Sequence, residues 1–218
     1  TNTNLRTSVD ISKQGITNGK DLPGAKLEIR AADGNLVEGW TSTKTPHTVR
    51  GLELEKAYTL TETRAPDGYA EAESIVFKLV QEGTEQVNEV YVKSNDGWKK
   101  LDDATVIMQD APVLDIDKTD IAGNLLPGAT LTIRDANDEV VDTWTTDYKT
   151  HRVPISNDFL KLSGEAKEYI YTLTEDAAPA GFEIAESVQF KVQKADESVC
   201  LFVRKNADAE WTRAGKRL

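Results

Sequence analysis

Three ionisable residues fall where alternating strand patterns place core side chains. In a β-strand every second residue shares one face, so a row of alternate apolar residues marks the buried side. Lys13, Glu62 and Asp110 each end such a row. The rows are Val9, Ile11 and Lys13; Tyr58, Leu60 and Glu62; and Val106, Met108 and Asp110. Burying an ionised group is costly unless it pairs or hydrogen-bonds with another group, so the pattern predicts that these three side chains meet inside the protein.

A lysine and a carboxyl group that meet in a core can react to form an amide. Burial favours the neutral amine and the protonated carboxyl, because desolvation disfavours the charged form of each. In this interpretation Lys13 is the nucleophile, Asp110 is the electrophile and Glu62 moves protons between them. The alternative is a buried ion-pair triad that does not react. The residues by themselves leave both interpretations open.

The chain contains most of this arrangement twice. The sequence Tyr-Thr-Leu-Thr-Glu ends at Glu62 and again at Glu175, and Ala-Pro-x-Gly and an aromatic residue follow each copy. Lys118 repeats Lys13 at the end of a matching strand pattern. At the offset of the two glutamates, the counterpart of the aspartate falls at position 223, beyond Leu218. We therefore expect Lys118 to be a free, reactive amine beside Glu175.

This pattern predicts a second domain without its final strand, and two interpretations of that end stay open. In the first, the domain presents an open groove and an unpaired strand edge. Such an edge would take a β-strand peptide, or a segment of a neighbouring chain, and bond its Asp or Asn to Lys118. In the second, the end is truncated or partly disordered, and the missing strand exists in the parent protein.

The elements that position these residues are short strands. Alternating runs are separated by turn signals about every 8–12 residues, and no stretch shows a helical period. The repeat divides the chain in two. This organisation is typical of an all-β protein with one sandwich in each half. The expected domains are residues 1–112 and 113–218. Nine additional residues in the second copy predict a longer surface loop within residues 154–167.

Composition excludes several classes of function. The formal net charge is −11 and the basic residues are scattered, which argues against nucleic acid as a partner. No apolar run approaches the length of a membrane span. The single cysteine, Cys200, excludes an internal disulfide and is expected to be a structural thiol. No targeting segment and no cofactor-binding motif is visible, so we expect no cofactor.

No residue pattern favours a metal site. His47 and His151 occur singly at matching positions of the two copies, so each is expected to be a loop histidine rather than a metal ligand. Asp115, Asp117 and Asp120 lack the glycine and terminal glutamate of a calcium loop. This acidic cluster is expected to be a solvated edge.

The repeated motifs resemble the B-type repeat domains of Gram-positive collagen adhesins and pilins. The resemblance rests on Val-Asp-Ile-Ser-Lys, on Leu-Pro-Gly-Ala-x-Leu-x-Ile-Arg, on Tyr-Thr-Leu-Thr-Glu-x-x-Ala-Pro-x-Gly-Tyr and on the closing Val-Ile-Met-Gln-Asp. It implies two tandem reverse immunoglobulin-like, prealbumin-like Greek-key β-sandwiches that form isopeptide bonds and are not enzymes. It assigns the cross-link to Lys13 and Asp110 and the catalytic role to Glu62. Many members of the family have Asn where this chain has Asp110, so the expected leaving group here is water.

The resemblance also implies a localisation and a function. It predicts stalk domains of an extracellular adhesin or pilus protein, attached to the cell wall through segments outside this chain. The partners would be other domains of the same surface protein. Two alternatives are a ligand-binding module for a host extracellular ligand, which would use the loop at 154–167 and the loops before His47 and His151, and the strand acceptor described above.

Overall fold

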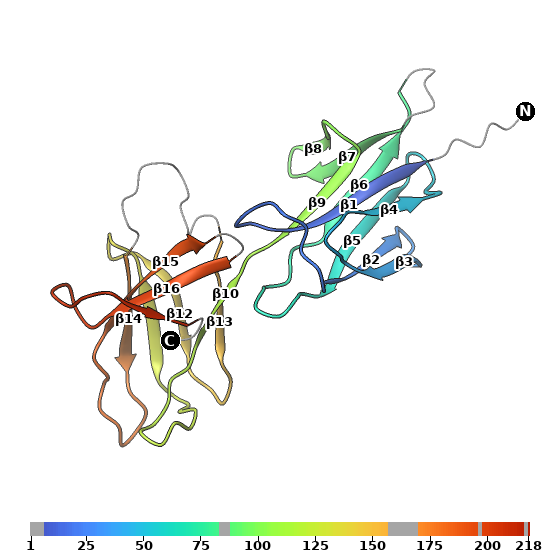
Figure 1. The fold of residues 1–218 in the computed structure, drawn as a ribbon. Helices are drawn as coiled ribbons and strands as arrows, with labels where there is room; N and C mark the ends of the chain where they lie inside the picture. Colours follow the sequence, from blue (N-terminus) through green and yellow to red (C-terminus); the bar gives the residue numbers. More distant parts are fainter. Residues whose placement is uncertain (1–6, 83–87, 157–169, 196–197, 216–217) are drawn as a thin grey trace, which may run out of the picture. The chain divides into compact units, whose positions relative to one another are not determined.

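The computed structural model describes the whole chain except residues 1–6, 83–87, 157–169, 196–197 and 216–217. The described residues form strands, turns and bends and contain no helix, which confirms the all-β prediction. The chain divides into two compact units, Thr1–Ala111 and Pro112–Leu218 (Figure 1). They are called the first unit and the second unit below. Because the described residues include no helix, none of them forms a helical membrane span.

The first unit contains a small and a large sheet. The small sheet has the order β4-β1-β9, and the large sheet has the order β3-β2-β5-β6-β7-β8 (Figure 1). Their strands are β1 (Ser8–Gly15), β2 (Lys26–Ala31), β3 (Leu36–Thr41), β4 (His47–Arg50), β5 (Ala57–Arg64), β6 (Ile75–Val80), β7 (Glu89–Ser94), β8 (Gly97–Lys100) and β9 (Thr105–Asp110). The first and last strands, β1 and β9, are parallel neighbours, whereas the other pairs in this unit are antiparallel.

The second unit repeats the large sheet. That sheet has the order β12-β11-β14-β15-β16-β17, and the small sheet consists of β10 and β13. The strands are β10 (Val113–Ile116), β11 (Thr130–Arg134), β12 (Val140–Thr145), β13 (His151–Pro154), β14 (Ile170–Ala177), β15 (Val188–Ala195), β16 (Ser198–Arg204) and β17 (Thr212–Ala214). The longer loop predicted within 154–167 lies mostly in 157–169, outside the described residues.

Strand alternation builds the core of the first unit as the sequence predicts. Val106 and Met108 of β9 are buried, while Ile107 between them is 48% exposed. Val9 and Ile11 of β1 are buried on the same inner side, and the apolar side chains of β2, β5 and β6 complete the cluster. These buried residues are Leu27, Ile29, Tyr58, Leu60, Phe77 and Leu79. The two sheets therefore enclose one apolar core, and the rows that end in ionisable residues point into it.

Among the described residues the small sheet of the second unit has two strands, β10 and β13. β10 pairs with β13 on one side. On its other side, among the described residues, β10 is bonded by Leu218: the Asp117 N–H donates to the Leu218 carbonyl, and the Leu218 N–H donates to the Asp115 carbonyl, both at 2.9 Å. These bonds place Leu218 across from Ile116.

Two proline–glycine turns meet beside the end of β5 and again beside the end of β14. Gly24 follows Pro in Leu-Pro-Gly-Ala and has a φ of 98°, a conformation that favours glycine. A Cβ added to Gly24 would lie 3.9 Å from the Cβ of Pro66, and a Cβ added to Gly128 would lie 3.7 Å from that of Pro179. The two repeated motifs therefore lie close together in both units, beside the end of the glutamate strand.

Candidate functional site

Lys13, Glu62 and Asp110 come together in the core of the first unit. The Lys13 Nζ contacts Asp110 Oδ1 directly and lies 3.1 Å from Glu62 Oε1. The lysine residue is 2% exposed, the glutamate 4% and the aspartate 0%. The three side chains come from β1, β5 and β9, so the cluster joins both sheets at the first and last strands of the unit.

Backbone register explains why these particular residues meet. In the parallel pair of β1 and β9, Lys13 lies opposite Met108, two residues before Asp110. The long lysine side chain spans that offset. In the large sheet Glu62 pairs with Leu27, directly after a register shift between Lys26 and Leu27. The same shift precedes the pair of Leu131 and Glu175 in the second unit. Each glutamate is thus held at an irregular point of an otherwise regular sheet.

A backbone N–H that the sequence reasoning missed holds each glutamate. The Ala72 N–H donates to Glu62 Oε2 at 2.7 Å, which leaves Oε1 directed at Lys13. In the second unit the Ala185 N–H donates to Glu175 Oε2 at 2.5 Å. The signal was present in the sequence, because an alanine stands ten residues after the glutamate in both copies. This bond orients the carboxylate before any reaction with the lysine.

Burial sets the protonation of the aspartate. Desolvation raises the pKa of Asp110 to about 7; the contact with Lys13 lowers it, and the nearby Glu62 carboxyl raises it again. Asp110 Oδ2 is buried and has no hydrogen-bond partner among the described residues. A carboxyl with this pKa is protonated in a large share of molecules near neutral pH. A protonated carboxyl carries a hydroxyl that can leave as water, which an ionised carboxylate does not.

Lys13→Met is expected to make the first unit less stable as the pH rises. This variant removes the interactions with Lys13 that lower the Asp110 pKa, so the folded value stays above the ordinary 3.8. The folded chain then binds more protons than the unfolded chain between the two values. Its free energy of unfolding is greatest at or below the ordinary pKa and falls by about 1.4 kcal/mol per pH unit up to the folded pKa.

Urea denaturation at about pH 5 and about pH 8 checks this expectation. The double variant Lys13→Met/Asp110→Asn is the matched control, because it keeps Glu62 and removes the titrating group. The pH dependence of the single variant should be the steeper of the two. Identical slopes would show that Asp110 is not held protonated by burial.

The second unit repeats two of the three groups. Lys118 Nζ lies 3.0 Å from Glu175 Oε2, the same oxygen that accepts from the Ala185 N–H. The Glu175 side chain is 2% exposed, whereas the Lys118 side chain is 17% exposed. Glu175 Oε1 is buried and has no hydrogen-bond partner among the described residues. Lys118 is therefore paired with Glu175 through Oε2 rather than free of contacts. Oε1 of the same carboxylate is left without a hydrogen-bond partner among the described residues.

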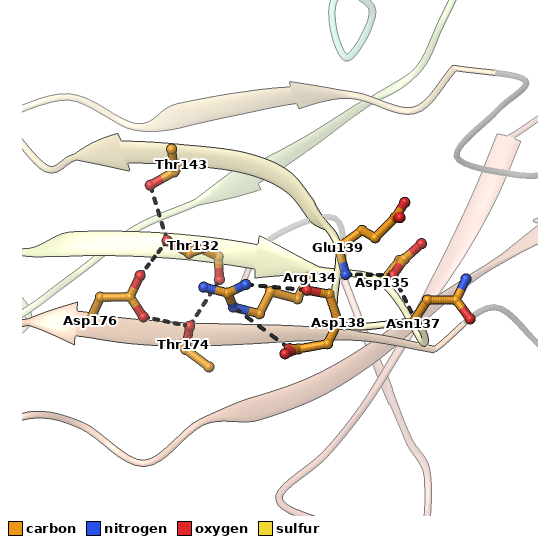
Figure 2. A network of polar contacts seen from close by, with 9 residues as sticks. All are labelled: Thr132, Arg134, Asp135, Asn137, Asp138, Glu139, Thr143, Thr174 and Asp176. Carbon is orange, nitrogen blue, oxygen red and sulfur yellow. Dashed lines mark hydrogen bonds and ion pairs between the residues drawn. The ribbon is translucent and has the colours of Figure 1, made fainter.

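Neighbouring acids in the second unit point to opposite faces of the sheet. Glu175 faces the core, and Asp176 faces outward, where Figure 2 shows it with Thr132 and Thr174. The hydroxyl of Thr132 donates to Asp176 at 2.6 Å and that of Thr174 at 3.1 Å. These bonds, the one from Thr132 first, lower the pKa of Asp176. Asp176 is thus the ionised surface acid, and only Glu175 belongs with Lys118.

The two histidines lie on strands, whereas the sequence pattern predicted that they lie in loops. His47 begins β4 and His151 begins β13. Each ring stacks on a tryptophan, with centroids 4.4 Å apart for Trp40 and 3.9 Å apart for Trp144. Each Nε2 also contacts a carboxylate of the preceding strand, at 2.7 and 2.8 Å. The assignment to loops was wrong because this stacking and pairing extend the strands up to the histidines.

The acidic residues and the cysteine have ordinary local partners. Asp115 pairs with Arg152 at 3.2 Å, and Asp120 accepts backbone N–H groups of its own turn. The half-buried Cys200 accepts from Arg213 Nη2 at 3.2 Å. Among the described residues, no three His, Cys, Asp or Glu side chains are placed to hold a metal ion.

Comparison with known proteins gives the family of both units. The model of the SpaA prealbumin-like fold domain matches residues 7–94 and again residues 113–205. No curated protein matches the chain. The first match thus contains Lys13 and Glu62, and the second contains Lys118 and Glu175.

Three of the solved structures with similarity to the chain come from Bacillus anthracis and Lactobacillus rhamnosus GG. The Bacillus anthracis TIE protein is 24% identical with a TM-score of 0.35; the match covers 88% of this chain and 32% of that one. The shaft pilin SpaA from Lactobacillus rhamnosus GG is 14% identical with a TM-score of 0.36, covering 89% of this chain and 96% of that one. The pilus adhesin SpaC from the same organism, in its open conformation, is 14% identical with a TM-score of 0.31, covering 93% and 28%. This chain therefore spans about a third of the TIE structure.

The family model covers most of each unit and includes both lysines and both glutamates. The repeated sequence, the repeated large sheet and the repeated lysine–glutamate pair agree with that match. The chain belongs to the family of SpaA prealbumin-like fold domains and contains two of them in tandem.

Proposed function

We propose that the chain is a structural stalk segment of a Gram-positive cell-surface adhesin or pilus protein, and that its first unit carries an amide between Lys13 and Asp110. The observation that carries this proposal is the buried contact of Lys13 Nζ with Asp110 Oδ1, with Glu62 Oε1 3.1 Å from the same nitrogen. Membership in the family of SpaA prealbumin-like fold domains supports the structural role.

The proposed reaction needs no cofactor. The neutral Lys13 amine attacks the carbonyl carbon of the protonated Asp110 carboxyl, and Glu62 accepts a proton from the attacking nitrogen. Glu62 then returns that proton to the departing hydroxyl, so one C–N bond forms, one C–O bond breaks and one water leaves. Holding the two reactants in contact removes roughly 7–11 kcal/mol of the barrier of a bimolecular reaction. The reaction occurs once per molecule, so the unit is not an enzyme.

The position of the amide explains its use in a stalk. Lys13 lies on the first strand of the unit and Asp110 on the last, and 97 positions separate them in the sequence. A covalent link between these strands closes nearly the whole unit into one loop. If the chain-entropy model for disulfides applies, closing such a loop contributes about 4–5 kcal/mol to the free energy of unfolding.

The same proposal accounts for the low cysteine content and for an extracellular localisation. The chain has one cysteine and therefore no internal disulfide, although extracellular proteins commonly use such bonds. An amide between two strands stabilises the fold in the same way and resists reduction. We place the chain outside the cell, attached to the wall through segments beyond this sequence, with neighbouring domains of the same surface protein as its partners.

Intact-mass measurement of the folded chain tests the proposal. We expect a mass lower than the sequence mass by one water, and a proteolytic map in which the Lys13 and Asp110 peptides are joined. Lys13→Arg should restore the full sequence mass, because a guanidinium stays charged and is a poor nucleophile. Lys118→Arg is the matched control and should keep the loss of one water. Full sequence mass with both peptides unmodified in the unsubstituted chain would refute the amide.

A further inference from the structure

The outer face of the large sheet in the second unit gathers basic and aromatic side chains from three neighbouring strands. Phe190 of β15 and Leu201 of β16 are buried in the core, so the residues that follow them, Lys191 and Phe202, lie on the opposite face of the sheet. The register places Lys191, Phe202 and Arg213 of β17 in one row across the strands. Folding thus brings together basic residues that are scattered along the sequence.

Arg204 lies in the next row of the same face, and three contacts hold its guanidinium group. Its Nε donates to Gln189 Oε1 at 2.8 Å, and its Nη1 donates to the Ala207 carbonyl at 2.9 Å. Its Cζ lies 4.5 Å from the ring centroid of Trp211. Nη2 takes part in neither hydrogen bond. Because these contacts already fix the side chain, a ligand that accepts from Nη2 immobilises little that was free before.

The first unit has a basic residue at the same place as Arg213 but pairs it with acids. In the registers of the two large sheets, Lys100 is the counterpart of Arg213. Glu89 is likewise the counterpart of Cys200. Lys100 Nζ lies 2.5 Å from Glu89 Oε1 and 3.6 Å from Glu82 Oε2. Arg213 Nη2 instead donates to the sulfur of Cys200 at 3.2 Å, so a thiol stands where the first unit has a carboxylate.

The second unit therefore has two guanidinium charges on this face that no carboxylate of the described residues pairs with. Arg213 is exposed, and it lies opposite Phe202, two residues before Arg204. Such diagonal neighbours on adjacent strands have Cα atoms roughly 7–8 Å apart. A guanidinium group recognises the oxygens of acidic groups through paired N–H donors. The face thus offers donors to two acidic groups spaced along an extended ligand.

We propose that this face of the second unit binds a sulfated polysaccharide, with Arg204 and Arg213 donating to its sulfate groups. The rings of Phe202 and Trp211 contact C–H groups of the sugars between them. A sulfate ester is a strong acid with more acceptor oxygens than a carboxylate, which suits these donors. The formal net charge of −11 disfavours nucleic acid and anionic membranes, whose dense phosphates would lie against the acidic rest of the chain. This binding is additional to the stalk role and independent of the Lys13–Asp110 amide.

Titration of the full 218-residue chain with heparin, a heavily sulfated polysaccharide, tests the proposal. At low salt we expect saturable binding by calorimetry, and the Kd should rise with salt because exposed charges are screened. The double variant Arg204→Gln/Arg213→Gln should weaken binding at least about tenfold, since it removes two charge-assisted contacts. The matched control is Lys93→Gln/Lys100→Gln, at the counterpart positions of the first unit. It removes the same charge from the chain and should leave the Kd nearly unchanged.

Exchanging the thiol gives a second, independent variant. Cys200→Glu places a carboxylate beside Arg213, as Glu89 stands beside Lys100, and should weaken heparin binding, whereas Cys200→Ser should leave it unchanged. Hydrogen exchange of β15, β16 and β17 shows that each variant is folded.

Several results would overturn the proposal. They are no saturable heparin binding by the unsubstituted chain, an equal loss in the two double variants, and equally tight binding of hyaluronan, which has carboxylates but no sulfates. Tighter binding of duplex DNA or of phosphatidylserine vesicles through the same arginines would also overturn it, because the ligand would then not be a polysaccharide. The intact mass reports the Lys13–Asp110 amide separately, so a failure of heparin binding leaves the proposed function in place.

Discussion

Pulling the chain from its two ends is expected to leave the first unit closed while the second unit extends. In the first unit the force enters at β1 and leaves at β9, and the proposed amide joins these strands directly. The residues between Lys13 and Asp110 then carry no tension. Lys13→Arg removes the amide, so the first unit should also unfold and release the 97 positions between the two residues. At 3.3–3.6 Å per residue this adds roughly 320–350 Å of extended chain.

Single-molecule stretching measures this length directly. The second unit is an internal control, because its Lys118 has no bonded carboxyl partner other than Glu175 among the described residues and it should extend in both chains. Lys118→Arg should leave the stretching record of the first unit unchanged. A first unit that extends by its full length in the unsubstituted chain would contradict the proposed cross-link.

Glu62→Gln is expected to give a folded chain that stays at its full sequence mass. Glutamine keeps the size of the side chain and an oxygen for the Ala72 N–H, but it does not accept the proton of the attacking amine. Loss of a general acid–base group slows a reaction by about 10²–10⁴-fold. Cross-linking that is complete within the time of folding and purification in the unsubstituted chain should then be incomplete or absent.

The matched control for this variant is Glu175→Gln, which changes the same residue type in the second unit. It should keep the loss of one water from the first unit. Hydrogen exchange of β1 and β9 shows whether Glu62→Gln has folded, and the mass followed over time gives the rate. Cross-linking at the original rate in the folded variant would show that Glu62 positions the lysine without moving protons.

The sequence alone was sufficient for the class of fold and for the candidates in the core. Alternation at Val106, Met108 and Asp110 predicts which side of β9 is buried, because a strand has a strict period of two residues and one face of each sheet must exclude water. The internal repeat predicts two units and marks Lys118 and Glu175 as the second copy of the site. These conclusions depend on local geometry, which neighbouring residues determine by themselves.

The tertiary structure decided which hydrogen-bond and ion-pair partners the buried ionisable groups have. Which glutamate oxygen faces the lysine depends on the backbone N–H of Ala72 or Ala185, ten residues away, and side-chain periodicity does not encode that bond. The histidines were misassigned for a related reason, since stacking on Trp40 and Trp144 is a contact between strands.

The register of Leu218 likewise appears only when β10 and the end of the chain are placed side by side. The glutamate offset would place position 219 opposite Ile116, one residue after Leu218, because the number of residues between the glutamate and this position differs by one between the two units. Sequence thus determined which residues can enter the core, through the fixed period of a strand. The folded structure decided which of them meet, because hydrogen bonds between distant strands set the register of one against another.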